Sequence, residues 1–185
     1  MGDSHYALAY ALGLFDDDSK GLNEWEMTTD LVGARQKRLL DYLKACYKEH
    51  RIRADGNCQF RALAFLLGNE STHESIRQKL CNVLQAGVGL ARPADAEGDN
   101  WFEVGDGSYG PIDLCRKDGQ WGNYQTLQAA AHLYDVRIVY VDDGGTPVAL
   151  EPRDTSESGK VWFLRWHNHY HYSVFVSRNY KNYKE

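Results

Sequence analysis

The stretch Asp55-Gly56-Asn57-Cys58-Gln59-Phe60-Arg61-Ala62-Leu63 joins a glycine-containing turn to the start of an apolar helix. The pattern predicts a helix over Phe60 to Leu67 that carries Cys58 at its beginning. A helix N-terminus bears about half a positive charge and several unpaired N–H groups, so it favours thiolate over thiol and binds a developing oxyanion. The stretch therefore predicts that Cys58 is a nucleophile and that Gly56 and Asn57 belong to its oxyanion turn.

A second signal lies in His167-Asn168-His169-Tyr170-His171-Tyr172-Ser173-Val174-Phe175, where histidines recur at every second position. Alternation is typical of a strand, in which residues at i and i+2 share a face. We expect one of His167, His169 and His171 to be the general base for Cys58. A second interpretation is a zinc site on the same strand, which needs a further ligand from elsewhere in the chain.

The chain has 185 residues, of which 43% are hydrophobic and 12% aromatic, enough for one domain with a proper core. We divide it into an N-terminal arm and amphipathic helix over 1–50, which complete or extend the domain, a catalytic domain over 51–177, and a polar tail over 178–185. The expected helices are Thr29–Tyr47, the Cys58 helix, one from Ser71 or Thr72 to Leu84, and Thr126–Tyr134, with surface loops and a short helix near Trp101–Val104 between Ala91 and Gly119. The expected strands are Val136–Val141, Val148–Leu150, Val161–Trp166 and the histidine strand. Helices followed by a small sheet indicate a mixed α+β fold.

Composition narrows the class of protein. The net charge is −5 and the pI about 5.8, which disfavours nucleic acid as a partner. No run of about 18 apolar residues and no secretory signal is apparent, so we expect no membrane contact. The four cysteines, Cys46, Cys58, Cys81 and Cys115, form no C-x-x-C pair, so we expect free thiols, a reducing compartment and no structural metal. A cytoplasmic monomer is the expectation, either a housekeeping protein or a host-targeted effector acting in the cytosol.

Three segments in order carry a resemblance to a known family. They are Asp55–Leu63, then Trp121-Gly122-Asn123 followed by Thr126-Leu127-Gln128-Ala129-Ala130-Ala131, and the terminal His-Tyr strand. Together they strongly resemble the ovarian-tumour (OTU) family of cysteine deubiquitinases, over roughly Arg53 to Val176. The resemblance implies a papain-like OTU fold with a small β-sheet between helical layers. It also implies hydrolysis, without cofactor or metal, of the isopeptide bond after the C-terminal Gly-Gly of ubiquitin, of polyubiquitin chains or of a ubiquitin-like modifier.

Carried over by motif, Cys58 is the nucleophile and Asp55 the aspartate of its turn, where it orients the base or braces the turn. The family's histidine stands in a His-aromatic dipeptide, and both His169-Tyr170 and His171-Tyr172 fit. We favour His171, because alternating apolar residues follow it. Many members carry Asp or Asn two residues after the histidine, where this chain has Ser173, so the third member of the triad is open.

Substrate recognition calls for a narrow groove with aromatic walls, and Trp121 and Tyr170 beside the motifs are the candidates. Loop acids would suit the basic face of ubiquitin. These are Asp99, Glu103, Asp106, Asp113 and Asp118. The rival functions are a catalytically silent ubiquitin-binding module, the metal-binding strand, and a papain-like peptidase of broad specificity.

Overall fold

The computed structural model describes residues 39–68, 71–87, 100–103, 109–145, 147–152 and 160–178. Its main sheet has five strands in the order β1-β7-β6-β4-β5. Their bounds are β1 Tyr47–His50, β4 Arg137–Asp142, β5 Pro147–Leu150, β6 Val161–His167 and β7 His171–Ser177. The β4–β6 pair is parallel and the other three pairs are antiparallel, so the sheet is mixed.

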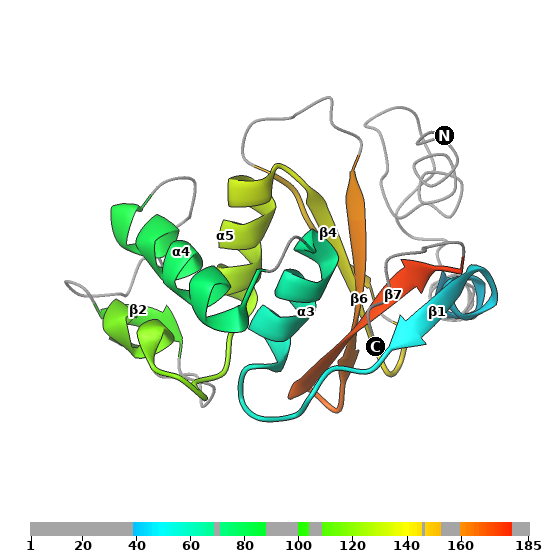
Figure 1. Ribbon diagram of the computed structural model, residues 1–185, viewed down its shortest axis with the longest axis horizontal. Helices are drawn as coiled ribbons and strands as arrows, with labels where there is room; N and C mark the ends of the chain where they lie inside the picture. The colour runs from blue at the N-terminus through cyan, green and yellow to red at the C-terminus, as the bar shows by residue number, and fades with distance from the viewer. Residues whose placement is uncertain are drawn as a thin grey trace, which may run out of the picture.

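Three α-helices lie together beside this sheet (Figure 1). They are α3 Cys58–Leu67, α4 His73–Ala86 and α5 Tyr124–Tyr134. A 3₁₀ turn, η1 Ile112–Arg116, packs on α4, and a small separate hairpin pairs β2 Asn100–Glu103 with β3 Tyr109–Pro111. Thr72 caps α4 by accepting from Ser75 N at 3.2 Å, and Asn123 forms a capping box with Thr126 at the start of α5.

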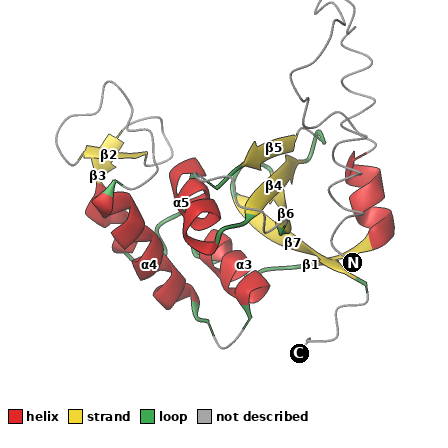
Figure 2. Ribbon diagram, turned by 90° about the horizontal axis from the view of Figure 1, so that it is seen from above, coloured by secondary structure: helices red, strands yellow, loops and turns green. Residues whose placement is uncertain are grey.

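Side chains on the two faces of the sheet belong to two separate hydrophobic clusters. Leu164, Tyr172 and Val174 pack toward the layer of α3, α4 and α5. Phe163 and Phe175 point the other way and pack with buried residues of the helical segment 39–46. Figure 2 shows this segment and the α3–α5 layer on opposite sides of the sheet. The predicted α+β fold with a sheet between helical layers is confirmed.

Most local predictions match, with two corrections in the elements. The Cys58 helix, the helix that ends at Tyr134 and the first three strands after it are present within a residue or two. The helix expected to reach Tyr47 ends at residue 46, and the chain continues directly into β1, which the sequence pattern did not predict. The short helix expected near Trp101–Val104 is wrong for residues 101–103, which belong to strand β2 and pair with β3. Predictions on residues 1–38 and on the tail from 179 fall outside the described residues.

The described helices include none that is both long and apolar enough to cross a membrane.

Candidate active site

The turn before α3 is held by Asp55. Its carboxylate accepts from Asn57 N at 3.1 Å and from Arg61, whose Nη2 lies 2.6 Å from Oδ2. The hydrogen bond from Arg61 is the main reason that the pKa of Asp55 falls to about 2, against an opposing effect of desolvation. Of the two predicted roles for Asp55, the geometry supports bracing the turn, because its carboxylate partners are arginines and backbone rather than a histidine.

Gly56 allows this turn to form. Its φ is +76°, a region that residues with a Cβ rarely adopt, and a Cβ placed there would overlap the carbonyl of Gly119. The turn and the segment around Gly119 therefore pack backbone to backbone.

Asn57 is anchored from its other side by a buried arginine. Arg77 is only 2% exposed, and its Nη2 donates to Asn57 Oδ1 at 2.6 Å, while Gly119 N donates to the same oxygen at 3.1 Å. Burial lowers the pKa of Arg77 to about 10, so it stays charged at neutral pH. The Asn57 side chain therefore holds the turn in place. The backbone φ of Asn57 is −104°, an ordinary value.

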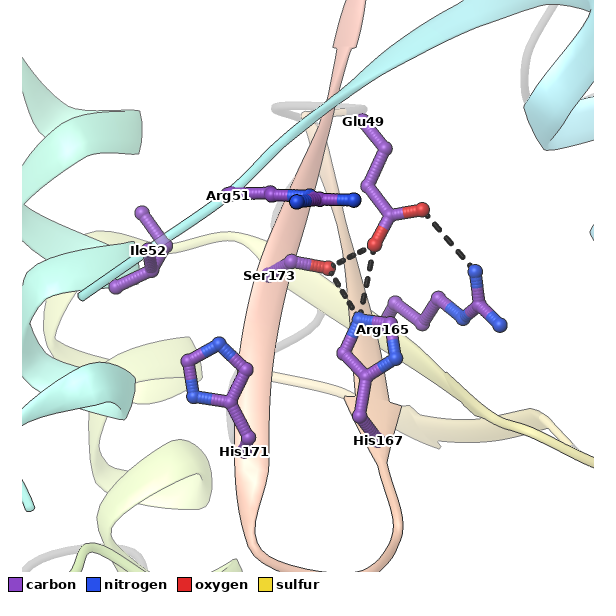
Figure 3. A pocket seen from close by; sticks show the side chains of 7 residues that line it. All are labelled: Glu49, Arg51, Ile52, Arg165, His167, His171 and Ser173. Atoms are coloured by element: carbon purple, nitrogen blue, oxygen red, sulfur yellow. Dashed lines mark hydrogen bonds and ion pairs between the residues drawn. The ribbon is translucent and has the colours of Figure 1, made fainter. Parts of the chain in front are cut away.

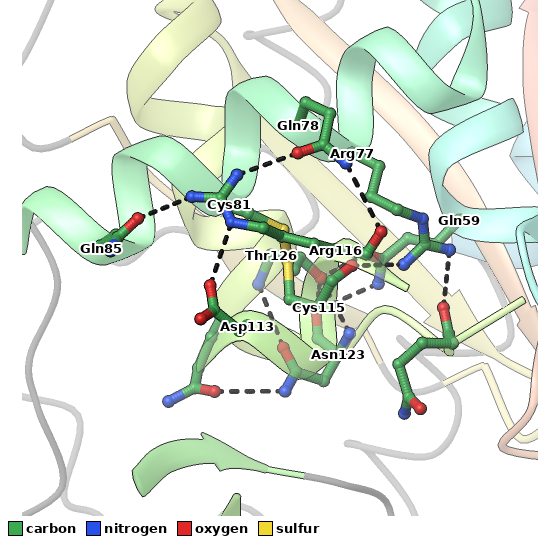
Figure 4. The surroundings of a disulfide bond; sticks show 12 residues. Gln59, Arg77, Gln78, Cys81, Gln85, Asp113, Cys115, Arg116, Asn123 and Thr126 are labelled. Atoms are coloured by element: carbon green, nitrogen blue, oxygen red, sulfur yellow. Dashed lines mark hydrogen bonds and ion pairs between the residues drawn. A yellow bond between two sulfur atoms is a disulfide. The ribbon is translucent and has the colours of Figure 1, made fainter. Parts of the chain in front are cut away.

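The same arginine connects the turn to a disulfide. Arg77 also donates to the carbonyl oxygens of Cys115 at 2.6 Å and Gln120 at 2.7 Å. Cys115 is bonded to Cys81, one helical turn along α4 from Arg77, as Figure 4 shows. The prediction that all four cysteines are free thiols is therefore wrong for Cys81 and Cys115. Both cysteines are buried, and their pairing across α4 and η1 is invisible to local spacing.

Cys58 is the first residue of α3 and is 6% exposed. Its Sγ lies 3.8 Å from the carbonyl oxygen of Tyr170 and is oriented to donate to it. Burial raises the pKa of the Cys58 thiol, and backbone hydrogen bonds with Tyr172 and Gln59 only partly oppose this. The expected thiolate is therefore not the resting form, because desolvation is the largest influence on the pKa of this thiol.

The histidine segment is a hairpin rather than one strand. His167 ends β6, His171 begins β7, and the two are register partners with ring centroids 5.9 Å apart. Between them, Asn168 and His169 take left-handed backbone conformations with φ of 48° and 65°. The prediction that the three histidines alternate along one strand is wrong, because the chain reverses at residues 168–170.

His171 lines a cavity of about 510 Å³ together with side chains from β1, β6 and β7 (Figure 3). The other lining residues are Glu49, Arg51, Ile52, Arg165, His167 and Ser173. Burial is the main cause that lowers the pKa of His171, and the charge of His167 acts in the same direction. A backbone hydrogen bond with Ile52 acts to raise that pKa, and the buried Nδ1 has no hydrogen-bond partner within the part of the chain that the structure describes. His171 is thus a neutral imidazole with an unused nitrogen.

Cys58 lines a neighbouring cavity of about 330 Å³ with aromatic walls. Trp121 and Tyr170, the predicted substrate-binding residues, both line it, with ring centroids 6.4 Å apart and about half of each residue exposed. His169 lines this cavity as well. Its ring centroid lies 4.7 Å from that of Trp166, and the two rings are nearly perpendicular. The structure therefore brings the predicted aromatic pair together beside the thiol.

The two signature segments of the sequence meet through Gln59. Its side-chain nitrogen donates to the carbonyl of Asn123 at 3.0 Å, and its oxygen accepts from the Thr126 hydroxyl. Gly122 lies so close to Gln59 that a Cβ there would overlap the glutamine side chain. This contact, which the sequence analysis did not anticipate, explains why Trp121 stands next to Cys58.

A metal site was the other interpretation of the histidines. Among the described residues no group of three or more His, Cys, Asp or Glu is arranged to hold a metal ion. His167 instead contacts Glu49 and Ser173, each at 2.9 Å through Nε2.

Comparison with protein families gives one model, an OTU-like cysteine protease, which matches residues 53–174. Among curated proteins, OVARIAN TUMOR DOMAIN-containing deubiquitinating enzyme 10 of Arabidopsis thaliana is 31% identical over 142 residues, which are 72% of this chain and 36% of that protein. Enzyme 11 of the same plant is 27% identical over 138 residues, 70% of this chain and 50% of that protein. The chain thus spans about a third to a half of these relatives.

Solved structures with the same fold include the OTU domain of OTUD1, with a TM-score of 0.58 and 20% identity, covering 80% of this chain and 96% of that one. An OTU domain in complex with ubiquitin has a TM-score of 0.53 and 19% identity, covering 73% of this chain and 72% of that one. At these identities the likeness concerns the fold.

Proposed function

Because the chain belongs to the OTU-like cysteine protease family, we propose that it is a cysteine-type deubiquitinase that hydrolyses the isopeptide bond after the Gly-Gly end of ubiquitin. The observation that carries the proposal is the position of Cys58, which begins α3 in an aromatic-walled cavity and contacts the carbonyl of the residue before His171. Such a reaction needs a nucleophile, a base and a groove for an extended tail. Cys58, His171 at the start of β7 and the aromatic-walled cavity are the candidates for these parts.

The chemistry follows from these parts. His171 takes the proton of the Cys58 thiol, and the sulfur attacks the carbonyl carbon of the terminal glycine. The N–H groups of Cys58 and the turn before it stabilise the oxyanion. The imidazolium then protonates the leaving lysine amine, and water attacks the thioester, releasing ubiquitin and the free thiol.

His171 is a better base than His169 on three grounds. Its Nδ1 is buried without a partner, its strand is packed against α3, and charged and polar side chains lie on its other side. His169 stands in a left-handed turn with its ring against Trp166. In the resting structure His171 and Cys58 line separate cavities, so the 168–170 turn must move for the proton to pass.

Ubiquitin as substrate is supported by the names of the relatives and by a similar fold that was solved with ubiquitin bound. The walls formed by Trp121 and Tyr170 suit a narrow tail without side chains, because glycine lets the backbone approach both rings closely.

The test is incubation of the protein with ubiquitin that carries a thiol-reactive group at its C-terminus. The wild type should form a covalent adduct, Cys58→Ala none, His171→Ala much less, and His169→Ala nearly as much as the wild type. Cleavage of diubiquitin should follow the same order. If His169→Ala and not His171→Ala abolishes the adduct, the assignment of the base is wrong. If folded wild type binds ubiquitin but forms no adduct, the chain is a silent binding module.

A further inference from the structure

The residue two places after the base is Ser173, a hydroxyl where an acid or amide would hold an imidazole. Ser173 is 1% exposed, and its Oγ donates to Glu49 Oε1 at 2.6 Å. The two residues are 124 positions apart in sequence. They meet because β1 lies beside β7 in the sheet, with Glu49 opposite Phe175. The Ser173 hydroxyl is thus hydrogen-bonded to the Glu49 carboxylate from the neighbouring strand.

Glu49 is charged at neutral pH. Burial acts to raise its pKa, but the hydrogen bond from Ser173 and the charge of Arg165 outweigh that effect and lower it. Arg165 Nη1 lies 3.1 Å from Glu49 Oε2. A partly buried carboxylate with this many donors is fixed in place.

Glu49 also contacts His167, the residue whose ring lies beside that of His171. Glu49 Oε1 lies 2.9 Å from His167 Nε2, and the His167 ring stacks beside His171 at an angle of 28°. The charged groups around the cavity come from three neighbouring parts of the sheet. Strand β1 and the residue after it supply Glu49 and Arg51, and β6 supplies Arg165 and His167. The turn after β4 supplies Asp143, whose Oδ1 lies 3.4 Å from His167 Nδ1. Figure 3 shows Glu49, Ser173 and His167 converging on one side of this cavity with His171 on the other.

We propose that Glu49 is the positioning acid of this site, in place of an acid two residues after the base: it holds His167, whose ring stacks on that of His171, and Ser173 on the strand of His171. This rests on the proposed function for the identity of the base. Glu49 supplies the negative charge that stabilises the imidazolium formed when His171 takes the thiol proton, and it fixes the side chains that pack beside that ring.

The experiment measures alkylation of Cys58 by iodoacetamide, which requires no ubiquitin. Modification of the Cys58 peptide is followed by mass spectrometry across pH 6 to 9 in the wild type, Glu49→Gln, His171→Gln and the double variant, with unfolding curves recorded for each. At neutral pH alkylation proceeds in molecules whose 168–170 turn has brought His171 to the thiol, and Glu49→Gln should slow it about tenfold, the effect of one unit of pKa. In the His171→Gln background the same change should have almost no effect, because the two residues act as one unit.

Two further variants make the test specific. Glu49→Gln combined with Ser173→Asp returns a carboxylate to the strand of the base and should recover much of the lost rate. Glu151→Gln removes an exposed glutamate that pairs with Arg137 just beyond β5, at the opposite edge of the sheet, and should leave the rate unchanged. Equal losses from Glu49→Gln in both His171 backgrounds, or no loss in either, would overturn the proposal. If the ubiquitin probe fails while the coupling between Glu49 and His171 holds, only the proposed substrate is wrong.

Discussion

Cys58 Sγ lies 3.8 Å from the carbonyl oxygen of Tyr170, and the next residue along the chain is His171. The thiol of the proposed nucleophile is therefore directed at the turn that leads into the strand of the proposed base. Because burial raises the pKa of Cys58 and lowers that of His171, the resting thiol and the resting imidazole are both neutral. The proton moves only when substrate or the turn brings the two side chains together.

This state predicts how Cys58 reactivity depends on pH. A raised thiol pKa leaves little thiolate at neutral pH, so the alkylation rate of Cys58 should climb steadily from pH 7 to pH 9. In urea-unfolded protein the thiol recovers its ordinary, lower pKa, and at pH 8 the same peptide should react faster than in the folded protein. A folded-state rate that is already constant from pH 5 upward would indicate a preformed thiolate and contradict the prediction.

Gly56→Ala should destabilise the protein more than an alanine at another left-handed glycine. Position 56 combines a φ of +76° with overlap against Gly119, whereas the left-handed Gly87 has a φ of +65° and nothing within 4 Å of a new Cβ. Gly87→Ala should therefore cost only the backbone term, about 1 kcal/mol, and Gly56→Ala several times that. Urea unfolding of the two variants measures the difference, and equal costs would show that the turn yields without strain.

Loss of Arg77 should affect both stability and the nucleophile. Arg77→Met leaves the carbonyl oxygens of Cys115 and Gln120 without the donor that Arg77 provides, and leaves Asn57 Oδ1 with Gly119 N alone. Unpaired buried acceptors cost about 1–3 kcal/mol each, so we expect a loss of several kcal/mol in unfolding free energy. We also expect slower reaction of Cys58 with the ubiquitin probe.

Arg116→Met is the matched control, since Arg116 bonds only to exposed side chains of Asp113, Gln78 and Gln85 in this region. Its cost should stay below about 1 kcal/mol. Similar losses for both arginines would mean that burial of Arg77 does not determine its contribution.

The disulfide predicts the number of titratable thiols. Without reductant, unfolded protein should show two free thiols, Cys46 and Cys58, and four after reduction. Cys81→Ala should lower the unfolding free energy by about 3–4 kcal/mol, as expected for a link across 34 residues, whereas Cys46→Ser at an exposed position should change it little. Four thiols before reduction would show that Cys81 and Cys115 are not bonded.

What the sequence predicted well is what neighbouring residues determine. The turn over Asp55–Asn57, the helix that follows it and the start of α4 at Thr72 all depend on contacts within a few positions. The parts that were missed depend on distant partners. Tyr47 continues the helical spacing of apolar residues, and only pairing with β7 makes Tyr47–His50 a strand.

The candidate site divides in the same way. Cys58, Trp121 and Tyr170 were found because motifs mark them, and the structure places them around one cavity. Glu49 carries no local signal, since its role arises from a contact with Ser173 across 124 positions. The hairpin at His169 was read as a strand because alternation continues through it, and nothing in the residue types announces two consecutive left-handed positions.

The hairpin of residues 167–171 also limits how this chain can vary. With His167 opposite His171, three residues close the reversal, two of them with positive φ. A single-residue insertion or deletion there would either leave a bulge or slip β7 by one position against β6, and a slip would turn His171 and Ser173 to the other face of the sheet. Substitutions in this turn are therefore tolerable where changes of its length are not.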